Sequence, residues 1–130
     1  MKLFSVVLVL ALSVSALAVE VKSTLSVTAA QPFNQSVNYS FGATFTNQSR
    51  YVRYDITNNG DQYLPFQQAN MVGMYFDARH TCQNGILPFN RCWVEIRYWP
   101  AFEGFHNAQL EMLFANYNDI LFYVSGQAIR

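Results

Sequence analysis

The stretch from Cys92 to Pro100, C-W-V-E-I-R-Y-W-P, constrains the fold of this chain more than any other. Side chains alternate along an extended chain, so the pattern predicts a strand with one apolar face and one aromatic and charged face. The apolar face would carry Cys92, Val94, Ile96 and Tyr98, and the opposite face Trp93, Glu95, Arg97 and Trp99. Pro100 ends the strand because it lacks a backbone donor. We expect one face to join a core and the other to meet solvent or a partner.

The first eighteen residues predict a cleaved secretory signal peptide. Lys2 precedes an apolar run from Leu3 to Leu12, and Ala16-Leu17-Ala18 supplies the small residues of a cleavage site after Ala18. The apolar run is too short for a membrane span. We therefore expect residues 19–130 to form a single exported domain, secreted or held in the periplasm or at the cell surface, without membrane insertion.

Charge is sparse and balanced in this chain. Eight basic and eight acidic side chains give a formal net charge of zero, so there is no basic field for nucleic acid. Hydrophobic residues make up 52% of the chain and aromatic residues 16%, which favours a well-packed domain over disorder.

The two cysteines, Cys82 and Cys92, most simply form one disulfide in an exported chain. Closing so short a loop would stabilise the fold by about 2 to 3 kcal/mol in the chain-entropy model. The alternative is a zinc site, which needs four ligands, and the spacing of His80 and His106 beside the cysteines fits no known arrangement. We expect a disulfide, with no metal and no cofactor.

Alternating segments separated by turn residues predict strands in the first half of the chain. Val21–Thr28 alternates apolar and polar residues, and a turn is expected at Gln31-Pro32. Arg50–Thr57 alternates more sharply, and Asn58-Asn59-Gly60-Asp61 has the composition of a tight turn. This predicts a hairpin whose returning strand runs from Tyr63 to Phe66.

The second half gives further strand signals. We expect a strand over Met71–Phe76, a polar loop over Asp77–Asn84, and a strand over Gln109–Phe114. Ile120–Val124 is apolar on both faces, which is typical of a strand covered on both sides. About seven short strands with regular turns predict an all-β fold, an antiparallel β-sandwich.

Catalytic chemistry has little support in the sequence. His80 and His106 lie in expected loops, and neither is near a Ser or Cys in a nucleophile motif. The carboxylates are spread over separate segments, among them Glu95, Glu103 and Glu111. Glu95 and Arg97 share one face of their strand, which predicts a surface ion pair. We expect the protein not to be an enzyme.

Trp93 and Trp99 are the most informative pair for binding. They lie on the same face of their strand, about 20 Å apart by the usual rise per residue. One interpretation is that another strand, a loop or Arg97 covers them. The other is that Trp93, Trp99 and Tyr51 form an exposed aromatic face, with Arg97 between them, that binds a partner surface or a glycan.

Three asparagines match the N-glycosylation acceptor pattern, at Asn34, Asn38 and Asn47. In a bacterial protein they would be polar loop residues. In a eukaryotic secreted protein, all three would lie in a segment that we expect to be exposed.

Several of these features together resemble the immunoglobulin-like domains of the ASH, Hydin and major sperm protein group. The matching residues are T-N-N-G at 57–60, Cys82, Leu87, the 92–100 stretch, Gly104, Ala108, Leu110 and V-S-G-Q-A at 124–128. The version in exported bacterial proteins, choice-of-anchor D, is the most similar, although Tyr98 stands where that pattern has Phe. The resemblance covers about residues 40–128 and implies a seven- to eight-stranded immunoglobulin-like β-sandwich.

These observations favour an exported, non-catalytic interaction or structural module. It would bind protein partners, components of the envelope or cell surface, through free sheet edges or the aromatic face. The alternative is a small secreted β-sandwich protein that holds a glycan or an apolar molecule among its Tyr and Trp side chains.

Overall fold

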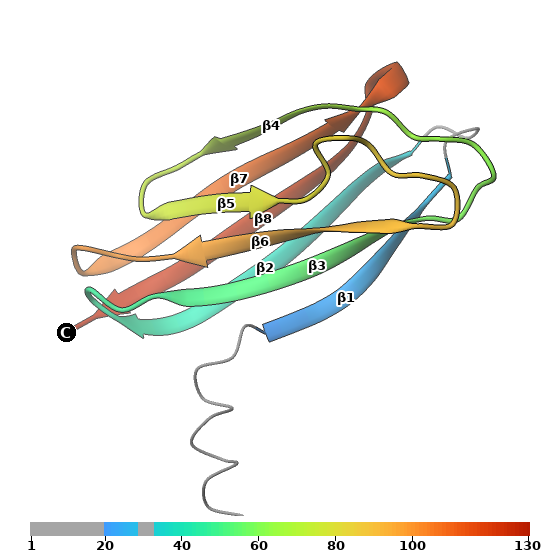
Figure 1. Cartoon of the computed structure of the whole chain (residues 1–130). Helices are drawn as coiled ribbons and strands as arrows, with labels where there is room; N and C mark the ends of the chain where they lie inside the picture. The colour runs from blue at the N-terminus through green and yellow to red at the C-terminus, as the bar shows by residue number, and fades with distance from the viewer. Residues whose placement is uncertain (1–19, 29–32) are drawn as a thin grey trace, which may run out of the picture.

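The computed structural model describes residues 20–28 and 33–130. Over these residues the chain forms eight strands in two layers (Figure 1). The strands are β1 (Glu20–Val27), β2 (Asn34–Phe45), β3 (Arg50–Asn58), β4 (Phe66–Val72), β5 (Phe76–His80), β6 (Arg91–Tyr98), β7 (Gly104–Phe114) and β8 (Asn118–Ile129). The expected signal peptide and the turn at Gln31-Pro32 lie outside the described residues. Within the described ranges, no helix has the length and apolar character needed to cross a membrane.

Each layer is a sheet of four strands. Sheet A has the order β1-β3-β6-β5, and sheet B has the order β2-β8-β7-β4. Most neighbours are antiparallel, but β1 pairs with β3 and β2 pairs with β8 in parallel. The expected β-sandwich with one disulfide is confirmed, with two parallel pairings that alternation alone does not reveal.

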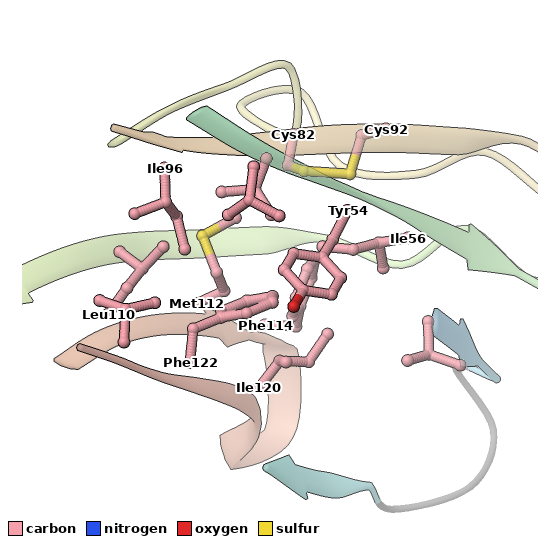
Figure 2. Packing of buried hydrophobic residues seen from close by; sticks show 14 of the residues in the cluster. Tyr54, Ile56, Cys82, Cys92, Ile96, Leu110, Met112, Phe114, Ile120 and Phe122 are labelled. Atoms are coloured by element: carbon pink, nitrogen blue, oxygen red, sulfur yellow. A yellow bond between two sulfur atoms is a disulfide. The ribbon is translucent and has the colours of Figure 1, made fainter. Parts of the chain in front are cut away.

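The core fills the space between the two sheets. The apolar face of β6 is buried as expected, and Val94, Ile96 and Tyr98 have no exposed surface. Figure 2 shows side chains from both sheets meeting there, and the rings of Tyr54 and Phe122 pack across the core with centroids 5.2 Å apart. Alternation along each strand thus places one face inward in both layers.

The predicted bond between Cys82 and Cys92 is present, with the two Cα atoms 5.1 Å apart. It joins the loop that follows β5 to the start of β6, and both cysteines are buried (Figure 2). The disulfide therefore fixes the entry to a strand that contributes several fully buried side chains to the core.

The expected hairpin at Asn58-Asn59-Gly60-Asp61 is wrong. β3 pairs with β1 and β6, and the segment after the turn does not return along it. Leu64 bridges to Ile86, and the chain then crosses to sheet B as β4. After these polar residues the chain passes from sheet A to sheet B, instead of reversing to pair with β3.

Three further strand assignments need correction. The segment Met71–Phe76 is not one strand, because β4 ends at Val72 and the chain changes sheets before β5 begins at Phe76. The expected polar loop at Asp77–Asn84 begins as strand β5. On β8 only one face is fully buried, since Tyr123 on the outer face is 40% exposed.

Candidate functional site

The outer face of sheet A carries the candidate binding residues, arranged in rows across β3, β6 and β5. The register places charged and aromatic side chains directly opposite one another, which lets cross-strand pairs interact. The rows are Asp55 and Trp93; Arg53, Glu95 and Arg79; and Tyr51, Arg97 and Asp77.

Glu95 is the centre of the middle row. Its carboxylate accepts a hydrogen bond from Arg79 Nε at 2.7 Å and another from Arg53 Nη2 at 3.3 Å. Only 2% of its side chain is exposed, so two guanidinium groups cover it from either side. The expected ion pair between Glu95 and Arg97 is therefore wrong, because cross-strand neighbours take the place of the residue two positions along.

Trp93 belongs to the same cluster. The guanidinium of Arg53 lies 4.1 Å from the centroid of the indole, and that of Arg79 lies 5.9 Å away. Both distances are within the range of a cation–π contact. Trp93 is half-buried as a result. The side chains that cover Trp93 come from β3 and β5. Trp93 therefore packs within sheet A and is less accessible to a partner than an open surface residue.

Arg97 and Trp99 form the open part of this face. Arg97 donates to Asp77 through Nε at 3.1 Å and through Nη2. The hydrogen bond to Asp77 raises the pKa of Arg97, and Tyr51 contributes in the same direction, so the guanidinium stays charged and oriented. The guanidinium carbon of Arg97 lies 4.8 Å from the centroid of the Trp99 ring. Trp99 remains 49% exposed.

Beside Trp99 lies a hollow of about 530 Å³. We call it the Trp99 hollow; its lining residues are Asn47, Tyr75, Phe76, Asp77, Arg97, Trp99, Pro100 and Ala101. Most of them come from three connections at one end of the sandwich, which are β2–β3, β4–β5 and β6–β7 (Figure 1). Ligand sites of proteins commonly have this size, although this one is open to solvent.

Backbone hydrogen bonds hold the three connections together. The Trp99 N–H donates to Tyr75 O at 2.8 Å, and the Asn47 N–H donates to Pro100 O at 2.7 Å. Asn47 and Tyr75 both have positive φ, at 66° and 71°. Such a conformation is unusual for an aromatic residue and often accompanies functional sites. The walls of the hollow are thus fixed by the fold.

Exposed apolar side chains adjoin the hollow. Met74 is 70% exposed and Phe102 is 68% exposed, both in the connections that form it. The ring centroids of Tyr75 and Phe102 are 6.3 Å apart. Trp99 therefore lies within an apolar end surface that a partner could cover.

The sequence did not indicate Tyr75, Asn47 or Asp77 as members of the site. Each is far from Trp99 along the chain, and only the strand register brings them together. The one available signal was the aromatic pair Tyr75-Phe76 next to Gly73 and Met74, which looked like part of a strand.

The remaining candidate residues serve the fold. His80 Nδ1 accepts the N–H of Cys82 at 3.1 Å, and His106 Nδ1 is 2.7 Å from the Tyr98 hydroxyl. Across the ranges 20–28 and 33–130, no three His, Cys, Asp or Glu side chains are grouped so that they could hold a metal ion.

The three acceptor-pattern asparagines, Asn34, Asn38 and Asn47, are all exposed. This exposure agrees with the expectation for the segment, although Asn34 and Asn38 lie on strand β2 and not in loops.

No protein-family model matches this sequence, and a search of curated proteins finds no match. Among solved structures, the chain is similar to the secreted serine protease VesC from Vibrio cholerae, with a TM-score of 0.53 and 16% identity over 68% of this chain. The similar region is 21% of the protease, so the likeness concerns a part of that protein and shows the fold alone.

Two other solved structures are more distant. PbICP-C in complex with falcipain-2 has a TM-score of 0.41 and 6% identity, over 81% of this chain and 99% of that one. The cysteine protease inhibitor EhICP2 from Entamoeba histolytica has a TM-score of 0.32 and 11% identity, over 81% and 96%. Likenesses at this level support no conclusion about what this chain binds.

Proposed function

We propose that this protein is an exported, non-catalytic interaction module that binds a partner protein through the Trp99 hollow and the apolar end surface around it. The observation that carries the proposal is a half-exposed tryptophan, stacked on a charged arginine, at the mouth of a hollow whose backbone is fixed. Tryptophan and arginine are among the side chains that most often dominate protein interfaces.

The preorganisation of the site supports this function. Arg97 is already oriented by Asp77, and Trp99 and Tyr75 are tied by a backbone hydrogen bond. A partner would therefore lose little affinity to ordering the Arg97 side chain and the backbone of the hollow. Export is supported by the buried disulfide, which is typical of proteins from oxidising compartments.

We also propose that the chain is an immunoglobulin-like domain of the ASH, Hydin and major sperm protein group. The motif residues have structural roles that fit such a pattern. Asn58 of the T-N-N-G motif is fully buried and bonds the 86–87 backbone, and Gly126 of the closing motif gives room to Tyr98.

A pull-down from the native envelope with matched variants tests the binding proposal. Trp99→Ser is expected to abolish capture of the partner while the unfolding transition stays close to that of the wild type. Trp93→Ser is the matched control, since Trp93 packs against Arg53, and it should lower stability while capture persists in folded protein. Equal capture by wild type and Trp99→Ser would refute the site.

A second candidate is a glycan ligand, favoured by the size of the hollow and by the aromatic side chains of Trp99 and Tyr75 that line it. Calorimetric titration of the purified protein with oligosaccharides distinguishes the two. Binding of a sugar that is lost in Trp99→Ser, with no protein captured from the envelope, would establish the glycan function instead.

A further inference from the structure

The two sheets differ in how their edge strands are protected. Edge strand β5 of sheet A contains two charged residues, Asp77 and Arg79. The edge strands of sheet B, β2 and β4, contain none. Charged residues on an edge strand discourage edge-to-edge pairing, so sheet B lacks a protection that sheet A has.

β2 is the longer of these two strands. Within the part of the chain that the structure describes, it pairs with β8 on one side and with no strand on the other. Its register with β8 is regular from Asn34 to Ser40 and then shifts before Ala43, where Gly42 has a φ of 71°. The regular segment 34–40 is therefore a continuous edge followed by a bulge.

We propose that two copies of this chain associate through antiparallel pairing of their 34–40 segments, which joins the two B sheets into one continuous sheet about a two-fold axis. The proposal deepens the expectation that the sheet edges bind partners and names a second copy as the occupant of the β2 edge. It does not depend on the Trp99 hollow, which lies in the connections at the end of the sandwich.

The two-fold axis determines the register. An axis perpendicular to the sheet keeps the outer face outward in both copies, so residues directly opposite must share a face. A pairing centred on Val37 satisfies this condition and includes every residue from Asn34 to Ser40 in both strands. Shifting the centre to Ser36 or Asn38 would push one end of each strand out of the regular segment.

This register places complementary side chains opposite one another. On the outer face, Asn34 would meet Ser40 of the second copy, and Ser36 would meet Asn38. Each amide could then exchange hydrogen bonds with a hydroxyl, and all four side chains are exposed in the single chain. On the inner face, the half-buried Val37 would meet its own copy and lose its remaining contact with water.

Charge and access favour β2 over β4. No charged residue occurs from Gln31 to Ser49, and the whole chain has a formal net charge of zero, so two copies meet there without repulsion. β4 is shorter and lies beside β5 at the margin of the other sheet (Figure 1). A strand added at β4 would therefore come close to Asp77 and Arg79 of β5.

Sedimentation equilibrium of the purified chain, from micromolar to millimolar concentration, tests the proposal. The wild type is expected to form a concentration-dependent dimer. The S36K/N38K variant places two pairs of like charges across the axis, and its dimerisation should weaken by about tenfold or more. A wild type that stays monomeric throughout would overturn the proposal.

Two control variants sharpen the test. S36K/N38E places a positive charge at position 36 opposite a negative charge at position 38 of the second copy, so it should dimerise at least as well as the wild type. Q68K/N70K adds the same charge to exposed positions on the β4 edge and should leave the dimer unchanged. Equal weakening by S36K/N38K and Q68K/N70K would assign the effect to net charge and overturn the β2 interface. Trp99→Ser, which tests the partner site, should dimerise as the wild type does.

Discussion

Gly126 of β8 lies directly against the ring of Tyr98 from β6. A Cβ atom at position 126 would overlap three atoms of that ring, Cδ2, Cε2 and Cζ. Tyr98 is fully buried and also stacks on Phe76, with centroids 4.5 Å apart. The tyrosine therefore has no space to move aside, and the absence of a side chain at 126 is what lets the two sheets close over it.

Gly126→Ala is accordingly expected to lower the free energy of unfolding by about 1–3 kcal/mol, the usual cost of overpacking a core. Urea unfolding followed by tryptophan fluorescence would measure the change. Ser125→Ala alters the neighbouring position and should shift stability by less than about 0.5 kcal/mol. If the two variants were equally stable, the Tyr98 ring would have to be more mobile than its contacts indicate.

Asn58 organises the crossing between the two sheets. Its side-chain amide donates to the backbone oxygens of Gln62 at 2.7 Å and Ile86 at 3.0 Å, and its Oδ1 accepts the Gly60 N–H. The residue has no exposed surface. Asn58→Ala would remove these three hydrogen bonds and the packing of a fully buried side chain, and is expected to cost about 2–4 kcal/mol in thermal or urea unfolding.

The neighbouring Asn59 supplies the control for that prediction. It is exposed, so Asn59→Ala should change stability by less than about 0.5 kcal/mol. Similar losses in the two variants would mean that turn conformation, rather than the buried amide of Asn58, stabilises the crossing.

The same segment shows what the sequence could and could not predict. Asn58-Asn59-Gly60-Asp61 correctly predicts the end of a strand, because such signals are local, but the chain bends here without forming the expected tight turn. The predicted hairpin is wrong, because the strand that pairs with β3 is determined by the burial of residues far away in the sequence. Leu64 is buried and bridges to Ile86, and this long-range contact directs the chain away from β3.

Glu95 gives a test of the ion-pair cluster on sheet A. Glu95→Gln keeps the shape of a buried side chain but removes the charge that Arg53 and Arg79 face. We expect a loss of about 1–2 kcal/mol in unfolding free energy, the lower end of the range for charged hydrogen bonds, because Arg79 is largely exposed. Urea unfolding of the two proteins at neutral pH would measure it.

Asp77→Asn is the matched neutralisation on the same face. The side chain of Asp77 is mostly exposed, so its pair with Arg97 should contribute less than about 1 kcal/mol. A larger loss for Asp77→Asn than for Glu95→Gln would contradict the assignment of Glu95 as the centre of the cluster.

The binding face was also predictable only in part, because local sequence patterns do not determine which strands pair. Alternation along β6 correctly placed Trp93 and Arg97 on one face and the cysteine on the other. The covering of Trp93 by Arg53 and the hollow beside Trp99 depend on strand register, which alternation leaves open. The predicted site is a row of residues along β6, whereas the candidate site in the structure is the Trp99 hollow at one end of the sandwich.

The stability of the protein should decline at mildly acidic pH because of His80. Burial lowers the pKa of His80 below its ordinary value of 6.5, and Nδ1 accepts the Cys82 N–H, which requires an unprotonated nitrogen. Between the lowered pKa and 6.5 the unfolded chain binds more protons than the folded one. The contribution of neutral His80 to the stability of the fold is therefore fully present above pH 6.5. It is lost as the pH falls through this window.

Unfolding free energies measured by urea titration between about pH 7.5 and pH 5 would test this linkage, in a range where most carboxylates stay ionised. His80→Asn provides an oxygen in place of Nδ1 to accept the Cys82 N–H but cannot gain a proton in this range. Its stability should change less with pH than that of the wild type, so any advantage of the wild type over the variant should shrink as the pH falls. Parallel curves would show that the acid sensitivity arises elsewhere and that His80 is equally well accommodated in both protonation states.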